Sequence, residues 1–242
     1  MVGDKVYTSV RSLTIGLGME TFVCDLGLMD YEWSWKLQKE LVERKARRLI
    51  RADYVLLVEH PHVFTLGRKG NPENIFADDV PVYRVERGGD VTYHGPGQQV
   101  VYPIVDLTKM QLSVKGYLRA LEQVIIDALG EFGISAGVIE GKTGVWVGER
   151  KIASIGVAVD RWITYHGVAL NVNTDMSYFY KIRPCGMPSE VMTSMERLLG
   201  RKTELGEVKR SILKSYSRIM DTTLIPVEKV NLESEFLSKV VG

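Results

Sequence analysis

The sequence predicts an α/β protein in which a mixed β-sheet is flanked by helices. Short apolar segments typical of strands occur in adjacent groups rather than in strict alternation with helices. Longer segments with apolar residues at helical spacing lie between these groups. A chain of 242 residues, 45% hydrophobic and 25% charged, can fill such a core without disulfide or metal staples.

The first half of the chain contains one predicted helix and several strands. Trp33, Leu37 and Leu41 stand near helical spacing with charged residues between them, which predicts a helix over Asp30–Leu49. Asp53–Glu59 is almost continuously apolar, as expected for a strand buried on both faces. Further strands are predicted at Thr21–Leu26, Val63–Leu66, Val82–Glu86 and Gln98–Val105.

The second half begins with a helix and continues as a hairpin. Leu118, Leu121 and Leu129 share one face of a predicted helix over Val114–Phe132. Two apolar segments around a Gly-Glu pair predict a hairpin. The remaining predicted elements are the hairpin strands Gly144–Val147 and Lys151–Val159, a strand at Ile163–Val172 and an amphipathic helix at Leu205–Met220.

We expect one domain at residues 19–225, with an N-terminal extension at 1–18 and a C-terminal extension at 226–242. The 31 basic and 30 acidic residues nearly cancel, so charge gives no case for a nucleic-acid partner. No apolar run approaches the ~20 residues that span a bilayer, so no membrane association is expected. The first residues lack the apolar core of a signal peptide, and we therefore expect a cytoplasmic protein.

The segment Arg87–Gln98, RGGDVTYHGPGQ, is the first candidate for a binding site. Its four glycines lie between two predicted strands and allow the backbone to approach a ligand closely. Polar residues such as Arg87 and His94 on a loop held by strands favour a site. A hairpin loop with bulges is the alternative interpretation.

Lys151 opens the second candidate segment, KIASIG, in which the other residues are small or apolar. An ammonium group held near an active site can bind an anion or, when deprotonated, act as a base. The alternative is a lysine at a strand end that reaches solvent.

The two cysteines, Cys24 and Cys185, are too few for a disulfide framework and form no metal-binding pair. Cys24 lies in an apolar strand and is expected to be packed in the core. Cys185 stands in a predicted loop between a proline and a glycine, with Lys181 and Arg183 nearby. Nearby cations lower the pKa of a thiol, so a reactive thiolate and a packed thiol both remain open.

Five blocks of the sequence follow one another along the chain. They are VEHPHVFTLGRKG (58–70), RGGDVTYHGPGQQVVYP (87–103), GVWVGERKIASIG (144–156), YHGVALNVNTD (165–175) and RPCGMPSEVMTSM (183–195). In this order the blocks resemble the octanoyl-carrier-protein:protein octanoyltransferase family, and the similarity runs from about Thr21 to Leu199. The family belongs to the superfamily of biotin and lipoate protein ligases, so the resemblance implies that fold.

The resemblance implies a catalytic Cys/Lys dyad at Cys185 and Lys151, with no metal and no cofactor. One departure is that the family cysteine is commonly followed by Gly-Tyr-Ala-Gly, whereas Gly-Met-Pro-Ser follows here, which can reshape the pocket or the partner surface. The implied substrate-binding residues are Arg87, Gly88, Gly89, Asp90, Val91, Thr92, Tyr93, His94, Ser154, Ile155, Gly156, Gly167, Val168 and Ala169.

The implied activity is ATP-independent transfer of octanoyl from acyl carrier protein to a specific lysine of apo lipoyl domains, through a thioester on Cys185. The implied acceptors are the lipoyl domains of 2-oxoacid dehydrogenase complexes and the glycine cleavage H protein. Because acyl carriers are acidic, basic residues are candidates for steering the donor, with a solvated helix face as the alternative. These residues are Arg44, Lys45, Arg47, Arg48, Arg51, Arg68 and Lys69.

Three other functions stay open. An ATP-dependent lipoate or biotin ligase would need no cysteine here and typically carries Arg-Arg-x-Ser-Gly-Gly-Gly, whereas this chain has Arg87-Gly-Gly and Cys185. A thiol enzyme could also move octanoyl between lipoyl-type domains. A non-catalytic binding domain is the third possibility, against which the Cys185 and Lys151 pair argues.

Overall fold

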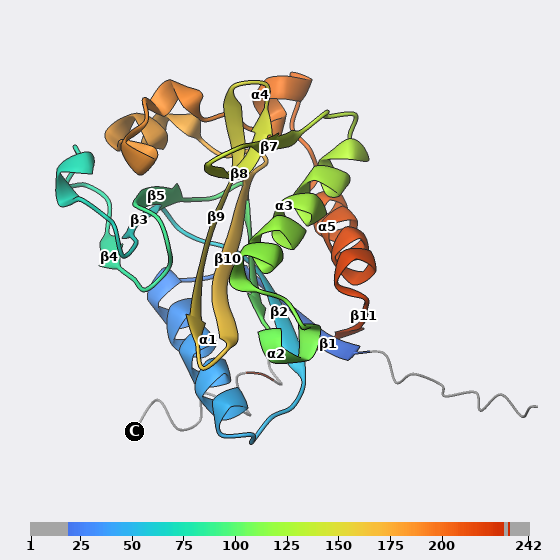
Figure 1. The fold of residues 1–242 in the computed structure, drawn as a ribbon. Coiled ribbons are helices and arrows are strands. Elements are labelled where there is room, and N and C mark those ends of the chain that lie inside the picture. The colour runs from blue at the N-terminus through green and yellow to red at the C-terminus, as the bar shows by residue number, and fades with distance from the viewer. Residues whose placement is uncertain (1–18, 230–231, 233–242) are drawn as a thin grey trace, which may run out of the picture.

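The computed structural model describes residues 19–229 and Leu232, the side chains of Met19 and Cys185 excepted. The predicted extension at 1–18 and most of the one at 226–242 lie outside these residues. A mixed eight-stranded sheet forms the centre of the described chain, with helix α1 (Tyr31–Ala46) on one face and helices α3 (Val114–Gly130) and α5 (Leu205–Met220) on the other (Figure 1). The predicted fold class is confirmed.

The large sheet has the order β11-β1-β2-β6-β10-β9-β8-β7. Strand β1 pairs in parallel with β2 and β11, and the other neighbours are antiparallel. Its strands are β1 (Met19–Leu28), β2 (Asp53–Glu59), β6 (Gln98–Ile104), β7 (Gly137–Ile139), β8 (Lys142–Val147), β9 (Arg150–Asp160), β10 (Ile163–Asn171) and β11 (Thr222–Pro226).

A second sheet of three short strands stands beside the large one, in the order β4-β3-β5. Its strands are β3 (Val63–Leu66), β4 (Val82–Arg84) and β5 (Val91–His94). The short α-helices are α2 (Leu107–Met110) and α4 (Met195–Leu199). Short 3-10 helices lie at Pro72–Asn74, Met176–Lys181, Pro184–Gly186 and Ser189–Val191.

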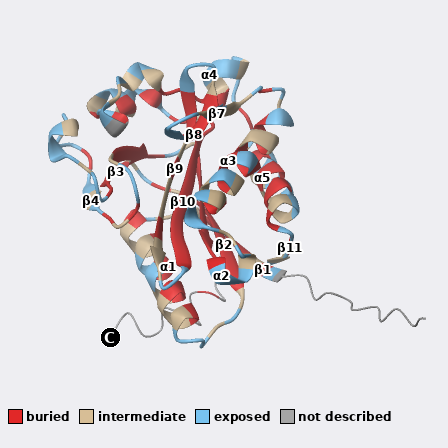
Figure 2. Ribbon diagram, viewed as in Figure 1, coloured by how far each residue is buried: buried red, intermediate tan, exposed pale blue. Residues whose placement is uncertain are grey.

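Two apolar cores lie on opposite faces of the large sheet, whose strands are mostly buried (Figure 2). Helix α1 begins at Asp30, whose carboxylate accepts a hydrogen bond from the Trp33 amide at 2.9 Å. Leu37 and Leu41, one helical turn apart, are fully buried against the sheet. The opposite core contains apolar residues of α3 and α5, and the large sheet is thereby covered on both faces.

Several elements differ from the prediction. Strand β5 lies inside the glycine-rich segment that we expected to be a loop, because its four residues pair with β3 between flanking glycines. Strand β11 was not predicted, and it carries the sheet to Pro226, one residue past the expected domain end. Cys185 lies in a single 3-10 turn rather than in a loop. Within the described residues, no helix is long and apolar enough to cross a membrane.

Candidate active site

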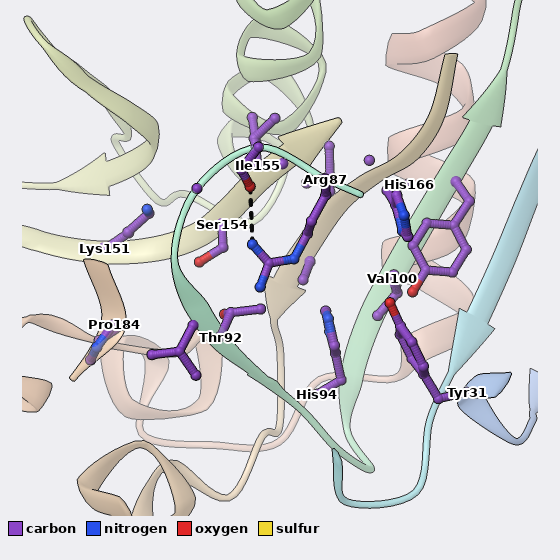
Figure 3. A pocket seen from close by; sticks show the side chains of 18 residues that line it. Tyr31, Arg87, Thr92, His94, Val100, Lys151, Ser154, Ile155, His166 and Pro184 are labelled. Atoms are coloured by element: carbon purple, nitrogen blue, oxygen red, sulfur yellow. Dashed lines mark hydrogen bonds between the residues drawn. The ribbon is translucent and has the colours of Figure 1, made fainter. Parts of the chain in front are cut away.

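A narrow cavity of about 50 Å³ lies between the glycine-rich segment, strand β5 and strands β6, β9 and β10 (Figure 3). Most of the predicted site residues line it, although they come from three separate sequence blocks. These are Arg87, Gly88, Gly89, Val91, Thr92, His94, Lys151, Ser154, Ile155, Gly156, Gly167, Val168 and Ala169. The other lining residues are Tyr31, Val100, Tyr102, His166 and Pro184.

Glycines let the backbone segments around the cavity approach one another closely. The Gly88 N–H donates to the Val157 carbonyl at 2.9 Å, which fastens the glycine-rich segment onto β9. A Cβ on Gly156 would stand 3.0 Å from the Gly88 carbonyl oxygen. At Gly167 a Cβ would stand 2.2 Å from the Val101 carbonyl oxygen, so only glycine fits there.

Arg87 is buried and supports the glycine-rich segment from inside. Its Nη2 atom donates to the Thr65 carbonyl at 2.6 Å and to the Thr65 hydroxyl at 2.9 Å. Its Nη1 atom donates to the carbonyl of Gly88 at 3.0 Å, the dashed line in Figure 3. The guanidinium therefore fixes this segment against strand β3.

His94 is held in one orientation by a buried amide chain. The Gln98 Nε2 group donates to the Tyr93 carbonyl at 3.1 Å and to Asn171 Oδ1 at 2.9 Å. Its Oε1 atom must then accept from His94 Nδ1, which lies 2.8 Å away, so the proton of this imidazole is assigned to Nδ1. Burial holds the pKa of His94 well below its usual value. The ring is therefore neutral, and its Nε2 atom is a hydrogen-bond acceptor.

The labelled side chains of Tyr31 and His166 lie at the end of the cavity opposite Lys151 and Pro184 (Figure 3). His166 adopts a left-handed backbone conformation, with φ +56°, and its amide donates to Gln38 Oε1 at 2.8 Å. Tyr31 stacks on His94, with ring centroids 5.8 Å apart. This end is therefore built from rings that their neighbours hold in place.

A buried histidine outside the cavity supports the ring of Tyr102, which also lines the cavity. The Nδ1 atom of His60 lies 2.8 Å from the Met29 carbonyl, to which it can only donate. Its Nε2 atom therefore accepts from the hydroxyl of Tyr102 at 2.9 Å. Burial lowers the pKa of His60 to about 4, which keeps this ring neutral at pH 7.

Lys151, the second residue of β9, is only 5% exposed and lines the cavity. The interpretation of Lys151 as a strand-end residue in solvent is therefore wrong. A Cβ on Gly144 would stand 2.5 Å from Lys151 Cε, so this glycine leaves room for the lysine stem. The Lys151 carbonyl accepts from the Thr193 amide at 2.9 Å, which ties β9 to the segment after Cys185.

The two cysteines lie in different surroundings. Cys24 is completely buried in the core under α1, as predicted. The side chain of Cys185 lies outside what the structure describes, but its backbone forms the 3-10 turn Pro184–Gly186. Pro184 lines the cavity, so the backbone of Cys185 is next to a lining residue.

Comparison with known proteins identifies the family. Residues 30–217 match the family described as the lipoyl protein ligase A/B catalytic domain. The chain is 50% identical over 208 residues to an octanoyltransferase of Solibacter usitatus, covering 83% of this chain and 93% of the relative. An octanoyltransferase of Syntrophobacter fumaroxidans is also 50% identical, over 84% of this chain and 91% of its own length. The chain belongs to the octanoyltransferase family.

Solved structures with low sequence identity share the fold of this octanoyltransferase. A bi-partite lipoate protein ligase from Thermoplasma acidophilum superimposes with a TM-score of 0.70 at 14% identity, over 92% of each chain. Biotin protein ligase from Aquifex aeolicus gives a TM-score of 0.51 at 13% identity, over 84% of this chain and 71% of its own. The predicted likeness to both ligase folds is confirmed.

Two predicted binding residues do not line the octanoyltransferase cavity. Along β5, Thr92 and His94 line it, whereas Tyr93 faces away and stacks on Tyr178 at 5.1 Å. The carboxylate of Asp90 accepts from the Asn71 amide at 3.0 Å and from Asn74 Nδ2 at 2.6 Å, which orders the neighbouring loop.

The cavity residues that the sequence analysis missed come from elements with no local mark of function. Tyr31 opens a helix, and Val100 and Tyr102 lie in a buried strand. His166 stands in a block that the resemblance had identified, beside the predicted Gly167, and its polar side chain in an apolar strand was the one available signal.

Proposed function

We propose that this octanoyltransferase carries an octanoyl group from the thioester of acyl carrier protein to a lysine amine of an apo lipoyl domain, through a thioester on Cys185. The observation that supports this most strongly is the buried Lys151 on the same cavity as Pro184, the neighbour of Cys185. Burying an ammonium group costs free energy, and a thiolate close to it offsets part of that cost. A lysine at this position can hold the Cys185 thiolate by charge and move its protons.

The first step exchanges one thioester for another. The Cys185 thiolate attacks the carbonyl carbon of the octanoyl thioester, a C–S bond to the enzyme forms, and the bond to the carrier sulfur breaks. The Lys151 ammonium gives its proton to the departing sulfur, so the carrier leaves as a thiol and Lys151 becomes neutral.

The second step returns that proton. The acceptor lysine, as a neutral amine, attacks the enzyme thioester, and neutral Lys151 takes a proton from the attacking nitrogen. The products are an octanoyl amide, a Cys185 thiolate and a Lys151 ammonium, which restores the starting pair. A thioester is close in energy to another thioester and higher than an amide, so the sequence of steps runs without ATP.

Backbone amides are the candidates for stabilising the oxyanion of each tetrahedral intermediate. The Gly88 N–H already donates to the Val157 carbonyl at 2.9 Å, which removes it from this role. Gly156 pairs with Gly167 in the β9–β10 ladder, which engages its N–H as well. Gly89 lines the cavity outside the strands and is the remaining candidate in this region.

The lining of the narrow cavity suits an alkyl chain. Apolar groups of Val91, Val100, Ile155 and Val168 contribute to it. Neutral His94 stands among them as an acceptor and orders the wall rather than exchanging protons with substrate. We therefore assign the carbonyl to the Lys151 end and the methyl terminus to the end at Tyr31.

Intact mass spectrometry tests this function. The protein is mixed with octanoyl-loaded carrier protein, without ATP and without acceptor, and an octanoyl adduct is expected on the wild-type chain. Cys185→Ala should abolish the adduct, whereas Cys24→Ala, at the packed cysteine, should retain it if the variant folds. Absence of an adduct on folded protein, together with ATP-dependent use of free lipoate, would favour a ligase instead.

A further inference from the structure

A second and much wider space adjoins the narrow cavity. It is a groove of about 500 Å³, and Lys151 lines both spaces. The two spaces also share Ile155 and the three glycines 88, 89 and 156. An acyl thioester has two arms that diverge from one carbonyl carbon. Two spaces that meet at Lys151 therefore offer a place for each arm.

Near Lys151 the groove has apolar walls. Trp146 of β8 is 2% exposed, and Leu118 of α3 and Met187 complete this part of the lining. The indole N–H of Trp146 is buried and has no hydrogen-bond partner among the described residues. A buried donor without a partner is costly, and an amide carbonyl in the groove could accept from it after a small movement of the ring.

The outer end of the groove is basic. A smaller hollow of about 140 Å³ shares Leu118, Lys142 and Thr143 with the groove and is lined in addition by Lys115 and Arg119. We call Lys115, Arg119 and Lys142 the basic mouth. Its one acidic lining residue is Glu122.

Glu122 is already engaged. It accepts from Arg119 Nη1 at 2.5 Å and from the Gly144 amide at 3.0 Å. The two exposed lysines of the basic mouth therefore give it an excess of positive charge. Lys115 also stands in the first turn of α3, where the helix dipole favours an anion.

We propose that the groove binds the phosphopantetheine arm of the acyl carrier, with the phosphate at the basic mouth. The amide-containing stem of the arm lies along Trp146 and Leu118, and the thioester reaches Lys151. This inference rests on the proposed function and specifies how the donor enters. The positive charge of the basic mouth favours this arm over the lysine side chain of the acceptor domain. The alkyl stem of that lysine carries no anion that would pair with Lys115 and Lys142.

The basic residues at the end of α1 and just after it fit the donor less well. Lys45 is buried and bonded to Asp53 at 2.6 Å, and Arg44 and Arg47 pair with Glu40 and Glu43. These pairs neutralise three of the seven basic residues that we considered for steering. The basic mouth is instead continuous with the groove that leads to Lys151.

Three octanoyl thioesters of decreasing length separate the parts of the arm. They are octanoyl-phosphopantetheine, octanoyl-pantetheine and octanoyl-N-acetylcysteamine. Rates of enzyme acylation are measured for the wild type, for the double variant Lys115→Gln/Lys142→Gln and for the control Arg48→Gln/Arg51→Gln. The control removes the same charge from residues that line a different hollow.

For the wild type and the control, the phosphate should raise kcat/KM about 10- to 100-fold over octanoyl-pantetheine, as expected for charge-assisted contacts. The Lys115→Gln/Lys142→Gln variant should lose most of this factor and use octanoyl-N-acetylcysteamine at the wild-type rate. The proposal would be overturned if that variant kept the wild-type ratio of kcat/KM for octanoyl-phosphopantetheine over octanoyl-pantetheine. It would also be overturned if the only change in the variant were a higher KM for the acceptor domain. If no thioester acylates the wild type, the proposed function itself fails, which is a result distinct from an unchanged factor.

Discussion

The two spaces that meet at Lys151 differ tenfold in volume, about 50 Å³ against about 500 Å³. The narrow cavity has walls of glycine backbone and rings that hydrogen bonds and stacking hold in place. The wide groove is bordered by residues of the first turns of α3, among them Val114, which is 37% exposed. Fixed walls suit a ligand part of constant length and shape, and an open groove suits an arm that must enter and leave.

The narrow cavity and the basic mouth also differ in what their residues contribute to the fold. Residues around the narrow cavity join β3, β5, β9 and β10 through Arg87, Gln98 and the glycines. Changes there should affect stability and substrate choice together. The basic mouth lies on the surface, so changes there should affect the donor alone.

The largest expected effect comes from Lys151→Met, because this residue belongs to both regions. Methionine preserves much of the buried stem but removes the ammonium. Acylation by every thioester donor should fall about 10²- to 10⁴-fold, the usual worth of a positioned acid or base. Quenched-flow mass spectrometry measures the rate.

The matched control for that variant is Lys142→Met, which changes a lysine of the groove alone. Its acylation by octanoyl-N-acetylcysteamine should stay at the wild-type level. Iodoacetamide alkylation of Cys185 in Lys151→Met should require higher pH than in the wild type. A folded Lys151→Met protein that acylates at the wild-type rate would remove the lysine from the mechanism.

The second prediction concerns how the free energy of unfolding depends on pH, through the histidines that support the narrow cavity. The pKa of buried His60 is lowered from 6.5 to about 4, so the unfolded chain binds more protons than the folded one between these values. The contribution of His60 to the free energy of unfolding is therefore fully present above pH 6.5. It falls by roughly 3 kcal/mol as the pH drops toward 4. His94, whose pKa is lowered further by burial, acts in the same direction. Urea unfolding at pH 7, 6, 5 and 4 should show this loss.

His60→Gln keeps a donor and an acceptor but removes the titrating ring. Its unfolding free energy should fall less steeply between pH 6.5 and 4 than that of the wild type. Parallel curves for the two proteins would place the pH dependence elsewhere.

The third prediction compares two glycines. In Gly167→Ala the new Cβ would meet the Val101 carbonyl oxygen at 2.2 Å, so the free energy of unfolding should fall by about 1–3 kcal/mol and acylation should slow. Gly130→Ala, at the end of α3, meets nothing within 4 Å and should gain about 0.5–1 kcal/mol. Urea midpoints measure both, and a neutral Gly167→Ala would show that β10 and β6 can separate without cost.

The smallest effect concerns chain length. Tyr31→Val removes one of the rings at the end of the cavity opposite Lys151. The ratio of kcat/KM for dodecanoyl over octanoyl thioester should rise about tenfold, at roughly 0.8 kcal/mol for each newly accommodated methylene and some loss from imperfect fit. A ratio that stays at the wild-type value, in a folded variant, would place the methyl terminus elsewhere.

Much of the scaffold could be predicted because its elements carry strong local patterns. Asp53–Glu59, Val63–Leu66 and Leu205–Met220 have the predicted bounds, since each apolar pattern ends where the element ends. Strand β5 was missed because four residues between glycines are too few to display alternation. Strand β11 was missed because tertiary pairing with β1 forms it.

The site could be predicted only in part. The glycine-rich segment and Lys151 stood out locally and line one cavity. The aromatic and histidine rings that line the cavity could not be predicted. Tyr31, Tyr102 and His166 come from a helix and two strands that meet only in the folded chain. The groove was missed for the same reason, since α3 and β8 border it together.

The most direct test of the central claim, that the two spaces hold the two arms of one thioester, is a crystal structure of the Cys185→Ala variant with a non-hydrolysable octanoyl-phosphopantetheine thioether. The account predicts the alkyl chain in the narrow cavity, ending at Tyr31, and the phosphate beside Lys115 and Lys142. An alkyl chain in the wide groove, or a phosphate away from the basic mouth with the chain in the cavity, would contradict it.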